Sequence, residues 1–370
     1  MKPSGFSIKT KSQPATGCIA RGRDGYHTST SQHGFSLVEL LIAMTITLIL
    51  LAGVVQIYTG SKQTYRSQEA NSRLQESGRT ATTILQRDIR SAGFQGCRSI
   101  SEIKPGIIAN APIPTIDTNS VIRGYEGSGS GWDSPLPAGL GTVLSGTDVI
   151  TIQHASSCGA NLTGNLGPLN ADIQVTYPNS CAFAANQVLI ISDCTSADIF
   201  RASGVSVVGN NPDKQTVSHA DNVNSSPKLS KSYGDDSEVL KLSSLTYFIA
   251  TGANGQPSLW RYDNTSAAAA GVNPMELVSD VADMQIEYGV DTRSNIDGIP
   301  DYYTTADTVQ ASNNWDLVTS ARISLLVQTP ADNIATQKQT YTYNRTSVTA
   351  PDRRIYRVFT TTVSIRNKVS

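Results

Sequence analysis

The stretch Gly34-Phe35-Ser36-Leu37-Val38-Glu39-Leu40-Leu41-Ile42-Ala43-Met44 opens an apolar run that continues to Tyr58. Residues 40–57 form eighteen consecutive positions without a formal charge. This run is long enough for a membrane-spanning helix and longer than the apolar core of a secretory signal. One acid, Glu39, stands at its entrance. Because a carboxylate inside a membrane helix costs about 2.5–3.5 kcal/mol on insertion scales, we expect Glu39 to have a function.

Gly34 followed by Phe35, with Glu39 five residues after the glycine, resembles the processing site of type IV prepilins and pseudopilins. The resemblance implies that a prepilin peptidase cuts between Gly34 and Phe35 and that the new amino group of Phe35 is methylated. It also implies that the helix packs into a filament core, where Glu39 neutralises the amino group of Phe35 in its own chain or a neighbouring one. The alternatives are a plain signal anchor and a secretory signal peptide, and the length of the apolar run disfavours the second.

Residues 1–34 are the expected cytoplasmic leader, which is cleaved. They contain five basic residues and one acid, Asp24, an excess that places the amino terminus in the cytoplasm and the bulk outside. The whole chain has 29 basic and 30 acidic residues, so 24 and 29 remain after the leader, a net charge of −5. A mildly acidic mature chain argues against a broad surface for nucleic acid. The long leader leaves open whether Met1 is the true start.

The helix is expected to continue beyond the apolar run. Residues 35–58 would be its transmembrane or filament-core half, and residues 59–93 a soluble amphipathic half without proline. Gly53 stands near the place where major pilins usually have a helix-breaking proline, so any local melting would depend on this glycine. The soluble half carries alternating charges and a discontinuous apolar stripe against which a sheet could pack. The stripe consists of Tyr58, Tyr65, Leu74, Ala81, Ile84, Leu85 and Ile89.

Residues 94–370 are predicted to form a β-rich periplasmic globular domain. Gly93 and Gly96 provide the usual chemistry for ending the helix, and residues 98–142 are predicted to be a long loop with a flexible tip at 127–131. Runs rich in β-branched and aromatic residues predict strands at 148–153, 172–177, 188–191, 199–208, 239–250, 258–262, 284–290, 322–328 and 356–365. The predicted fold class is α+β and pilin-like, with a long amino-terminal helix packed on this domain.

Residues 87–97, with the sequence RDIRSAGFQGC, are similar to the PilW family of minor pilins, and residues 181–200 share this similarity. The resemblance implies a minor pilin that helps to prime assembly of the type IV pilus and lies in a complex at or near the pilus tip. That complex would support adhesion and twitching motility. The implied partners are other minor pilins, the major pilin, the prepilin peptidase, the inner-membrane assembly platform and a large tip adhesin. The chain would begin as a single-pass inner-membrane protein and then enter the pilus at the cell surface.

The cysteines predict disulfides rather than a metal site. Cys18 belongs to the leader, and the mature chain keeps an even set in a domain expected to reach an oxidising space. We favour a local Cys181–Cys194 pair and a Cys97–Cys158 pair that ties the end of the helix to the sheet, although four cysteines allow three pairings. The chain has no CxxC pair, and only two histidines follow the leader, His154 and His219.

No catalytic constellation is evident. The chain has no G-x-S-x-G elbow, P-loop or HExxH motif, so we expect no enzyme activity, no catalytic residues and no cofactor. One group of oxygen ligands surrounds a turn glycine and suggests a structural calcium loop: Asp291, Asn295, Asp297 and Asp301. It departs from the EF-hand pattern because Arg293 takes the first ligand position. A simple Asx turn is the alternative.

Three other functions compete with the minor-pilin interpretation. The J-type pseudopilin of type II secretion shares the amino-terminal features. A DNA-uptake pilin would need a basic surface, for which the carboxyl-terminal end of the chain offers candidates, and a membrane-tethered hydrolase would need the missing catalytic residues. The candidate basic residues are Arg353, Arg354, Arg357, Arg366 and Lys368.

Overall fold

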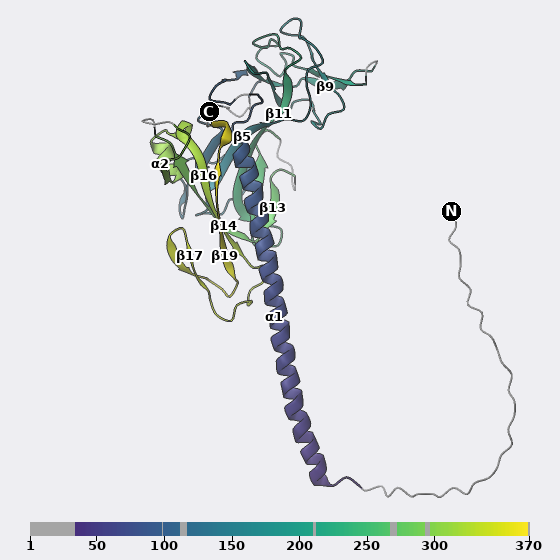
Figure 1. Ribbon diagram of the computed structural model, residues 1–370, viewed down its shortest axis with the longest axis vertical. Coiled ribbons are helices and arrows are strands. Elements are labelled where there is room, and N and C mark those ends of the chain that lie inside the picture. Colours follow the sequence, from purple (N-terminus) through teal and green to yellow (C-terminus); the bar gives the residue numbers. More distant parts are fainter. Residues whose placement is uncertain are drawn as a thin grey trace, which may run out of the picture. The chain divides into compact units, whose positions relative to one another are not determined.

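The computed structural model describes residues 34–97, 99–111, 117–209, 212–266, 272–292 and 297–368. The expected leader therefore lies outside the described residues except for Gly34. The chain divides into two compact units, Met1–Gly60 and Ser61–Ser370. Helix α1 (Leu37–Ser91) is a single element of 55 residues that begins in the first unit and ends in the second (Figure 1).

The apolar part of α1 lies in the first unit and is helical throughout. Its most apolar 18-residue window has a mean hydropathy of 2.5, and no residue of that window is buried. The helix continues through Gly53 without a break. Thr45, Thr47 and Thr59 donate their hydroxyls to carbonyls three or four residues earlier, at 2.7–3.1 Å. These bonds satisfy the hydroxyls within the helix, so the threonines cost little in an apolar environment.

The soluble part of α1 buries one face. Its buried residues are three or four positions apart, the spacing that places side chains on the same side of a helix: Ala70, Leu74, Gly78, Ala81, Leu85 and Ile89. Most of the predicted stripe is confirmed, but Tyr58 and Tyr65 are 66% and 67% exposed. The stripe prediction was wrong at these two tyrosines, because the buried face begins only at Ala70.

The largest sheet has eight strands and is organised around β11 (Glu238–Thr251). One edge of β11 pairs with β5 (Val149–Ser156), while the other pairs first with β7 (Val188–Ser192) and then with β12 (Pro257–Asp263). The other four strands extend the sheet at its edges: β1 (Gly106–Ile107), β2 (Ile122–Tyr125), β8 (Ala197–Arg201) and β13 (Met275–Ser279). Only β1 and β8 pair in parallel among these described strands.

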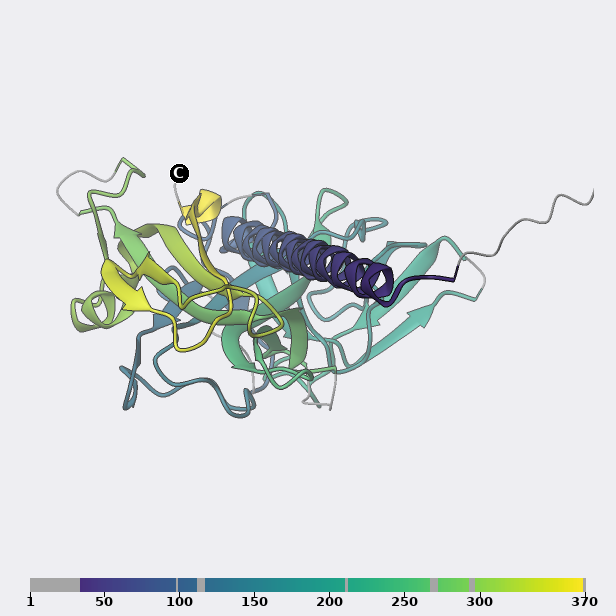
Figure 2. The ribbon, with the colours of Figure 1, turned by 90° about the horizontal axis from the view of Figure 1, so that it is seen from below.

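A second sheet of four antiparallel strands has the order β15–β14–β16–β19. Its strands are β14 (Val281–Val290), β15 (Tyr302–Thr304), β16 (Val318–Gln328) and β19 (Tyr356–Ser364). The short helix α2 (Ala306–Ala311) and the 3-10 turns η1 (Trp315–Leu317) and η2 (Arg366–Lys368) flank it. Figure 2 looks nearly along α1 and shows the green-to-yellow strands of this sheet beside it.

Three small sheets complete the second unit. One contains β6 (Ile173–Thr176), β10 (Lys214–Ser218) and β9 (Gly204–Val207), and the others are the pairs β17–β18 (Thr340–Tyr343, Thr346–Thr349) and β3–β4 (Gly127–Ser128, Gly131–Trp132). The predicted flexible tip at 127–131 is therefore a tight hairpin, and that prediction was wrong. Trp132 Nε1 donates to the Thr147 carbonyl at 3.0 Å, and Gly127 N–H donates to Asp148 Oδ1 at 2.9 Å. Contacts distant in sequence thus order a segment whose composition indicates a loop.

Strand β11 contributes buried side chains to four hydrophobic cores. Its first part places Val239 in a core with β6, β7, β8 and β10. Its later residues Leu245, Tyr247 and Ile249 belong to the core formed by α1, β5 and the second sheet. Figure 1 shows β11 extending from the region of β9 toward β5. The α+β fold with a long helix on a β-rich domain is thereby confirmed.

Candidate functional site

The amino end of α1 holds the predicted processing residues. Residues 34–36 are not helical, and Ser36 offers its carbonyl to Leu40 N–H at 3.1 Å, the first hydrogen bond of the helix. Phe35 is 84% exposed, and the space around Gly34 is open. The bond between Gly34 and Phe35 therefore lies in accessible, non-helical chain, which is the form in which a peptidase can bind a substrate.

Glu39 is exposed in the first turn of α1. The N–H groups of this turn lack helical partners, and the helix dipole favours a negative charge there. Glu39 follows Phe35 by four residues, and the non-helical chain at residues 34–36 directly precedes the helical turn that carries it.

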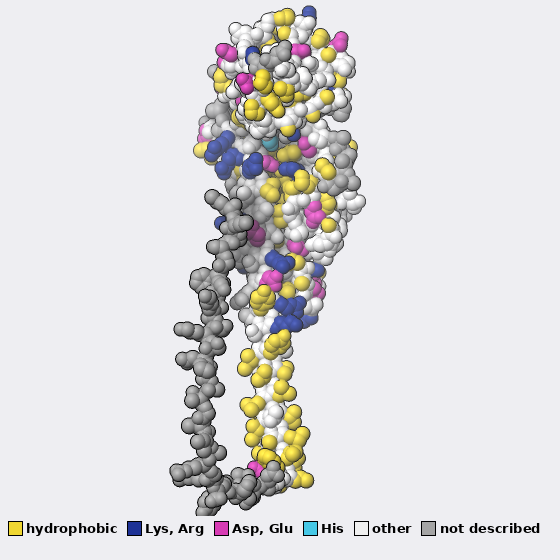
Figure 3. All heavy atoms as spheres, turned by 90° about the vertical axis from the view of Figure 1, so that its right-hand side faces the viewer, with side chains coloured by type: hydrophobic (Ala, Val, Ile, Leu, Met, Phe, Trp, Pro, Cys, Tyr) yellow, Lys and Arg dark blue, Asp and Glu magenta, His cyan; other side chains and the backbone are white. Residues whose placement is uncertain are grey.

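The surface of α1 beyond Glu39 is apolar on all sides. Sixteen large hydrophobic side chains between Phe35 and Tyr58 are exposed, each by more than half. Figure 3 shows this surface as a continuous band of hydrophobic side chains along the helix. Since burying one such side chain is worth about 1.5–3 kcal/mol, this part of α1 is stable only in lipid or against other helices.

The structure contains two disulfides, Cys97–Cys194 and Cys158–Cys181, with Cα atoms 5.1 and 5.0 Å apart. The favoured pairing, Cys181–Cys194 with Cys97–Cys158, was therefore wrong. Strand β7 lies between Cys181 and Cys194 and separates them by its five residues, about 17 Å at 3.3 Å per residue. The antiparallel pairing of β7 with β8 brings Cys194 to the end of the sheet beside Cys97.

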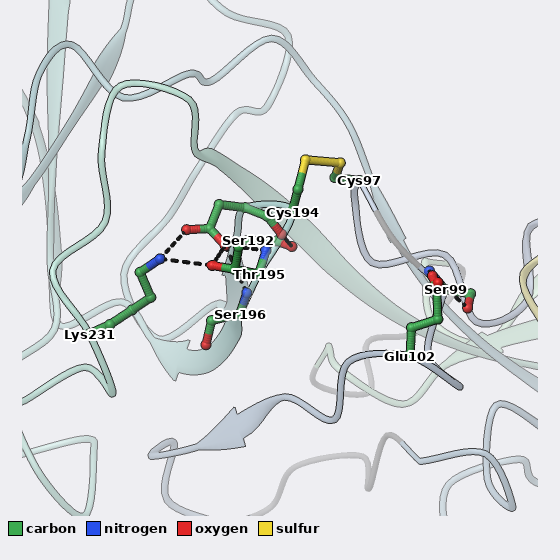
Figure 4. The surroundings of a disulfide bond; sticks show 9 residues. Cys97, Ser99, Glu102, Ser192, Cys194, Thr195, Ser196 and Lys231 are labelled. Carbon is green, nitrogen blue, oxygen red and sulfur yellow. Dashed lines mark hydrogen bonds and ion pairs between the residues drawn. A yellow bond between two sulfur atoms is a disulfide. The ribbon is translucent and has the colours of Figure 1, made fainter.

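A polar network fixes the turn that carries Cys194 (Figure 4). Asp193 Oδ1 accepts the N–H groups of Thr195 and Ser196, both at 2.7 Å, and Lys231 Nζ lies 2.6 Å from Asp193 Oδ2. Burial alone would raise the pKa of Asp193, but the Lys231 ammonium and these donors outweigh burial and lower it to about 2. The carboxylate is thus held ionised, and it orients the cysteine toward the end of α1.

The candidate calcium loop is engaged in turn contacts where it is described. Asp291 Oδ2 accepts the N–H groups of Asp297 and Gly298 at 3.1 and 2.7 Å, and Asp301 Oδ2 accepts Thr292 N–H at 2.8 Å. Asn295 lies outside the described residues. No cluster of three or more His, Cys, Asp or Glu side chains suited to a metal occurs in the described part of the chain. Thermal unfolding with and without a chelator tests the calcium interpretation: a lower Tm with the chelator would support a calcium loop, and an unchanged Tm would favour the simple turn.

The two histidines occupy separate structural positions. His219 Nε2 lies 2.9 Å from the Ala171 carbonyl, and its ring packs edge-on against Phe200. His154 Nδ1 lies 3.0 Å from the Ala155 carbonyl and 3.4 Å from Ser156 Oγ. Among the described residues Nε2 of His154 has no hydrogen-bond partner, so this part of the chain does not supply the third, orienting group of a catalytic triad to the serine and histidine.

Two of the basic residues near the carboxyl end, Arg354 and Lys368, are engaged in contacts within the domain. Arg354 pairs with Asp352 at 3.1 Å and donates to the Thr329 carbonyl at 2.8 Å. Lys368 is half-buried and donates to the Trp315 carbonyl. Arg366 lines a cavity together with Arg87 and Arg90 of α1, which the sequence did not reveal because these residues are distant along the chain.

Two family models match the chain. The model described as Prokaryotic N-terminal methylation motif matches residues 29–55, and the one described as PilW, Type IV Pilus-assembly protein W, matches residues 246–367. The first match contains Gly34, Phe35 and Glu39. The second runs from within β11 to η2, so the similar phrases at 87–97 and 181–200 lie outside it. Neither the comparison with curated proteins nor the one with solved structures found a match.

Proposed function

Because this chain is a PilW-like type IV pilin, we propose that it acts as a minor pilin that primes assembly of the type IV pilus. It joins other minor pilins in a complex at or near the pilus tip and through that complex supports adhesion and twitching motility. Its other partners are the major pilin, the prepilin peptidase, the inner-membrane assembly platform and a large tip adhesin. Before assembly it spans the inner membrane once, with its bulk in the periplasm, and afterwards it lies in the pilus.

The observation that carries this proposal is the combination of an all-round apolar helix with an acid in its first turn. A helix that is apolar on every side is suited to lipid or to the middle of a helix bundle. Glu39 is unfavourable in either place unless a positive charge accompanies it. Cleavage before Phe35 supplies that charge as a new amino group, and the same helix then suits both the membrane and the filament.

The second unit supports a structural rather than an enzymatic role. The matched families describe a pilin and a methylation motif, and His154 and His219 are held by backbone carbonyls instead of by a nucleophile and an acid. Two disulfides suit a domain that works in the periplasm and at the cell surface, where the environment is oxidising. We therefore propose that the chain performs no catalysis and is itself the substrate of the peptidase.

Mass spectrometry of the amino terminus tests the class of the protein. The mature chain recovered from sheared filaments is expected to begin at Phe35 and to carry a methyl group on its amino nitrogen. A functional filament protein that still carries residues 1–34 would contradict the proposal.

Deletion of the gene tests the pilus role. We expect surface pili to be lost while exoprotein secretion continues. The opposite result, intact pili with failed secretion, would instead assign the chain to type II secretion as a J-type pseudopilin.

A further inference from the structure

The side of the main sheet that faces α1 changes from apolar to polar beyond the end of the core. On neighbouring strands β5 and β11, Ile152 lies opposite Leu245 in the core. Two residues further along β5 the opposed pair is His154 and Ser243, and after that Ser156 and Lys241. Because residues two apart on a strand share a face, these polar side chains continue the same surface toward the carboxyl end of α1.

This polar surface lines a groove, which we call the α1-end groove. It consists of two adjoining cavities of about 380 and 330 Å³, and both are lined by Arg87, Asp88, His154 and Ser156. Each volume lies within the range of small-ligand sites, roughly 300–1,000 Å³. The groove is bounded by α1, the sheet and the carboxyl-terminal turn η2.

Positive charge dominates the α1-end groove. Its five cationic side chains come from three parts of the fold: Arg87, Arg90, Lys241, Arg261 and Arg366. None of the five forms an ion pair with a carboxylate of the described residues. Figure 3 shows a cluster of Lys and Arg side chains beside a histidine on this face. The helix dipole accounts for Arg90 in the last turn of α1, but it does not account for the cations on strands β11 and β12.

The two acids of the groove already have partners. Asp88 Oδ2 accepts the hydroxyl of Tyr247, and Asp263 Oδ1 accepts Thr265 N–H at 2.9 Å and the Thr265 hydroxyl at 2.6 Å. These neutral donors orient both carboxylates and leave their negative charges in place. The five cations of the groove still outnumber its two acids, and this net positive charge raises the local concentration of anions.

His154 adds an unpartnered polar atom at the same place. Its side chain lines both cavities, and the residue is 8% exposed. Nδ1 donates to the Ala155 carbonyl at 3.0 Å, whereas Nε2 is buried without a hydrogen-bond partner among the described residues. With the proton on Nδ1, Nε2 is an acceptor. Buried polar atoms are normally hydrogen-bonded, so this acceptor beside a cavity suits the hydroxyl of a hydrogen phosphate ion or an ordered water.

We propose that the α1-end groove binds a multiply charged oxyanion, of which phosphate is the simplest member. The fork of an arginine side chain matches the oxygens of such an anion, and cations from α1, the strands and η2 surround it. A ligand with a single carboxylate carries one negative charge and would leave most of the five cations of the groove without a counter-charge. The bound anion would link the end of α1 to the sheet and to the carboxyl-terminal turn. This site does not depend on the proposed role in the pilus.

Titration of the full-length chain with inorganic phosphate tests the site. The protein is kept in a neutral detergent, and binding is measured by calorimetry and by the shift in Tm, with sodium chloride and sodium acetate at matched ionic strength as controls. We expect phosphate to bind saturably with a rise in Tm that chloride and acetate do not produce. An equal rise with chloride would overturn the proposal, because it would reflect general screening of charge.

Variants locate the binding. Arg87→Gln combined with Lys241→Gln is expected to weaken phosphate affinity at least tenfold. Arg79→Gln, an exposed position on α1 outside both cavities, is the matched control and should leave affinity unchanged. If the double variant fails to fold, the single variant Lys241→Gln replaces it in the phosphate titration. Unchanged affinity in the groove variants would overturn the proposal.

Glycerol 3-phosphate distinguishes the source of the anion. Competition with inorganic phosphate would show that the groove accepts a phosphoryl group on a larger molecule. Binding of inorganic phosphate without such competition would identify the free ion as the ligand. Failure of both to bind would overturn the site.

Discussion

At the scale of single residues, Gly78 shows how closely the second sheet approaches α1. A Cβ atom at this position would overlap with Cε2 of Phe359 on β19. Glycine inside a helix costs about 1 kcal/mol relative to alanine, so its presence here indicates a packing requirement. The sequence alone does not show this, since Phe359 is more than 280 residues away.

Gly78→Ala is expected to destabilise the second unit by about 1–3 kcal/mol, because overpacking outweighs the gain in helix propensity. The free energy of unfolding in urea measures the effect. Combining Gly78→Ala with Phe359→Ala should cost less than the sum of the two single changes, since the smaller side chain makes room for the methyl group. If the two free-energy changes simply add, Gly78 and Phe359 do not limit each other's size.

Glu39→Ala is expected to leave the chain in the membrane but to reduce its incorporation into filaments at least tenfold. The substitution removes the carboxylate that we propose pairs with the amino group of Phe35, while insertion into lipid becomes easier. The ratio of the chain in sheared filaments to the chain in membranes measures incorporation. Glu69→Ala is the control, because this acid on α1 forms only an exposed pair with Arg73 at 2.7 Å. Wild-type incorporation of the Glu39 variant would contradict the proposed role.

At the scale of elements, local sequence predicts which segments form helices and strands but not which other segments they pack against. Helix α1 and all nine predicted strand ranges correspond to observed elements, since periodicity and β-branched residues act locally. Residues 199–208 divide into β8 and β9. The elements β1 to β4, which lie in the predicted loop at 98–142, were not predicted, nor were β13, β15, β17, β18 and α2. The cysteine pairing could not be derived either, because it depends on the antiparallel return of β8 along β7. The match to the methylation motif at residues 29–55 contains the predicted processing residues, whereas the α1-end groove joins segments remote in sequence.

The two disulfides are expected to differ in their effect on stability. Cys97–Cys194 spans 97 residues and Cys158–Cys181 spans 23, so loop-closure entropy gives about 4.7 and about 3.4 kcal/mol. Replacing both cysteines of the first pair by serine should therefore lower the free energy of unfolding more than the same change in the second pair. Urea unfolding of the two double variants measures the difference. The reverse order would show that strain or residual structure, rather than loop length, decides the effect.

At the scale of the whole molecule, buried acids make stability depend on pH. Asp148 is 2% exposed, and its oxygens accept the N–H groups of Gly127 and Ile286 at 2.9 and 2.7 Å. Burial, followed by the charge of Glu126, raises the pKa of Asp148 to about 8 despite these donors. Burial also raises the pKa of Glu126 to about 7. Both groups keep their protons in the folded protein at a pH where the unfolded chain has lost them.

The protein is therefore expected to be more stable at about pH 5 than at about pH 7. The unfolded chain binds fewer protons at these groups across this range, so the free energy of unfolding falls as pH rises from the unfolded pKa values near 4 toward the folded values. Lys368, whose pKa burial lowers to about 7, affects stability mainly above this range. Glu126→Gln should reduce the difference between urea midpoints at the two pH values. An unchanged difference would show that these acids do not control it.

The passage of β11 through four cores has a mechanical consequence. A filament protein is pulled along its length whenever the filament is under tension. Because one continuous strand supplies side chains to all four cores, none of them can be opened without shearing part of the ladder that supports the others. The domain should therefore yield to force in a single rupture rather than by successive peeling.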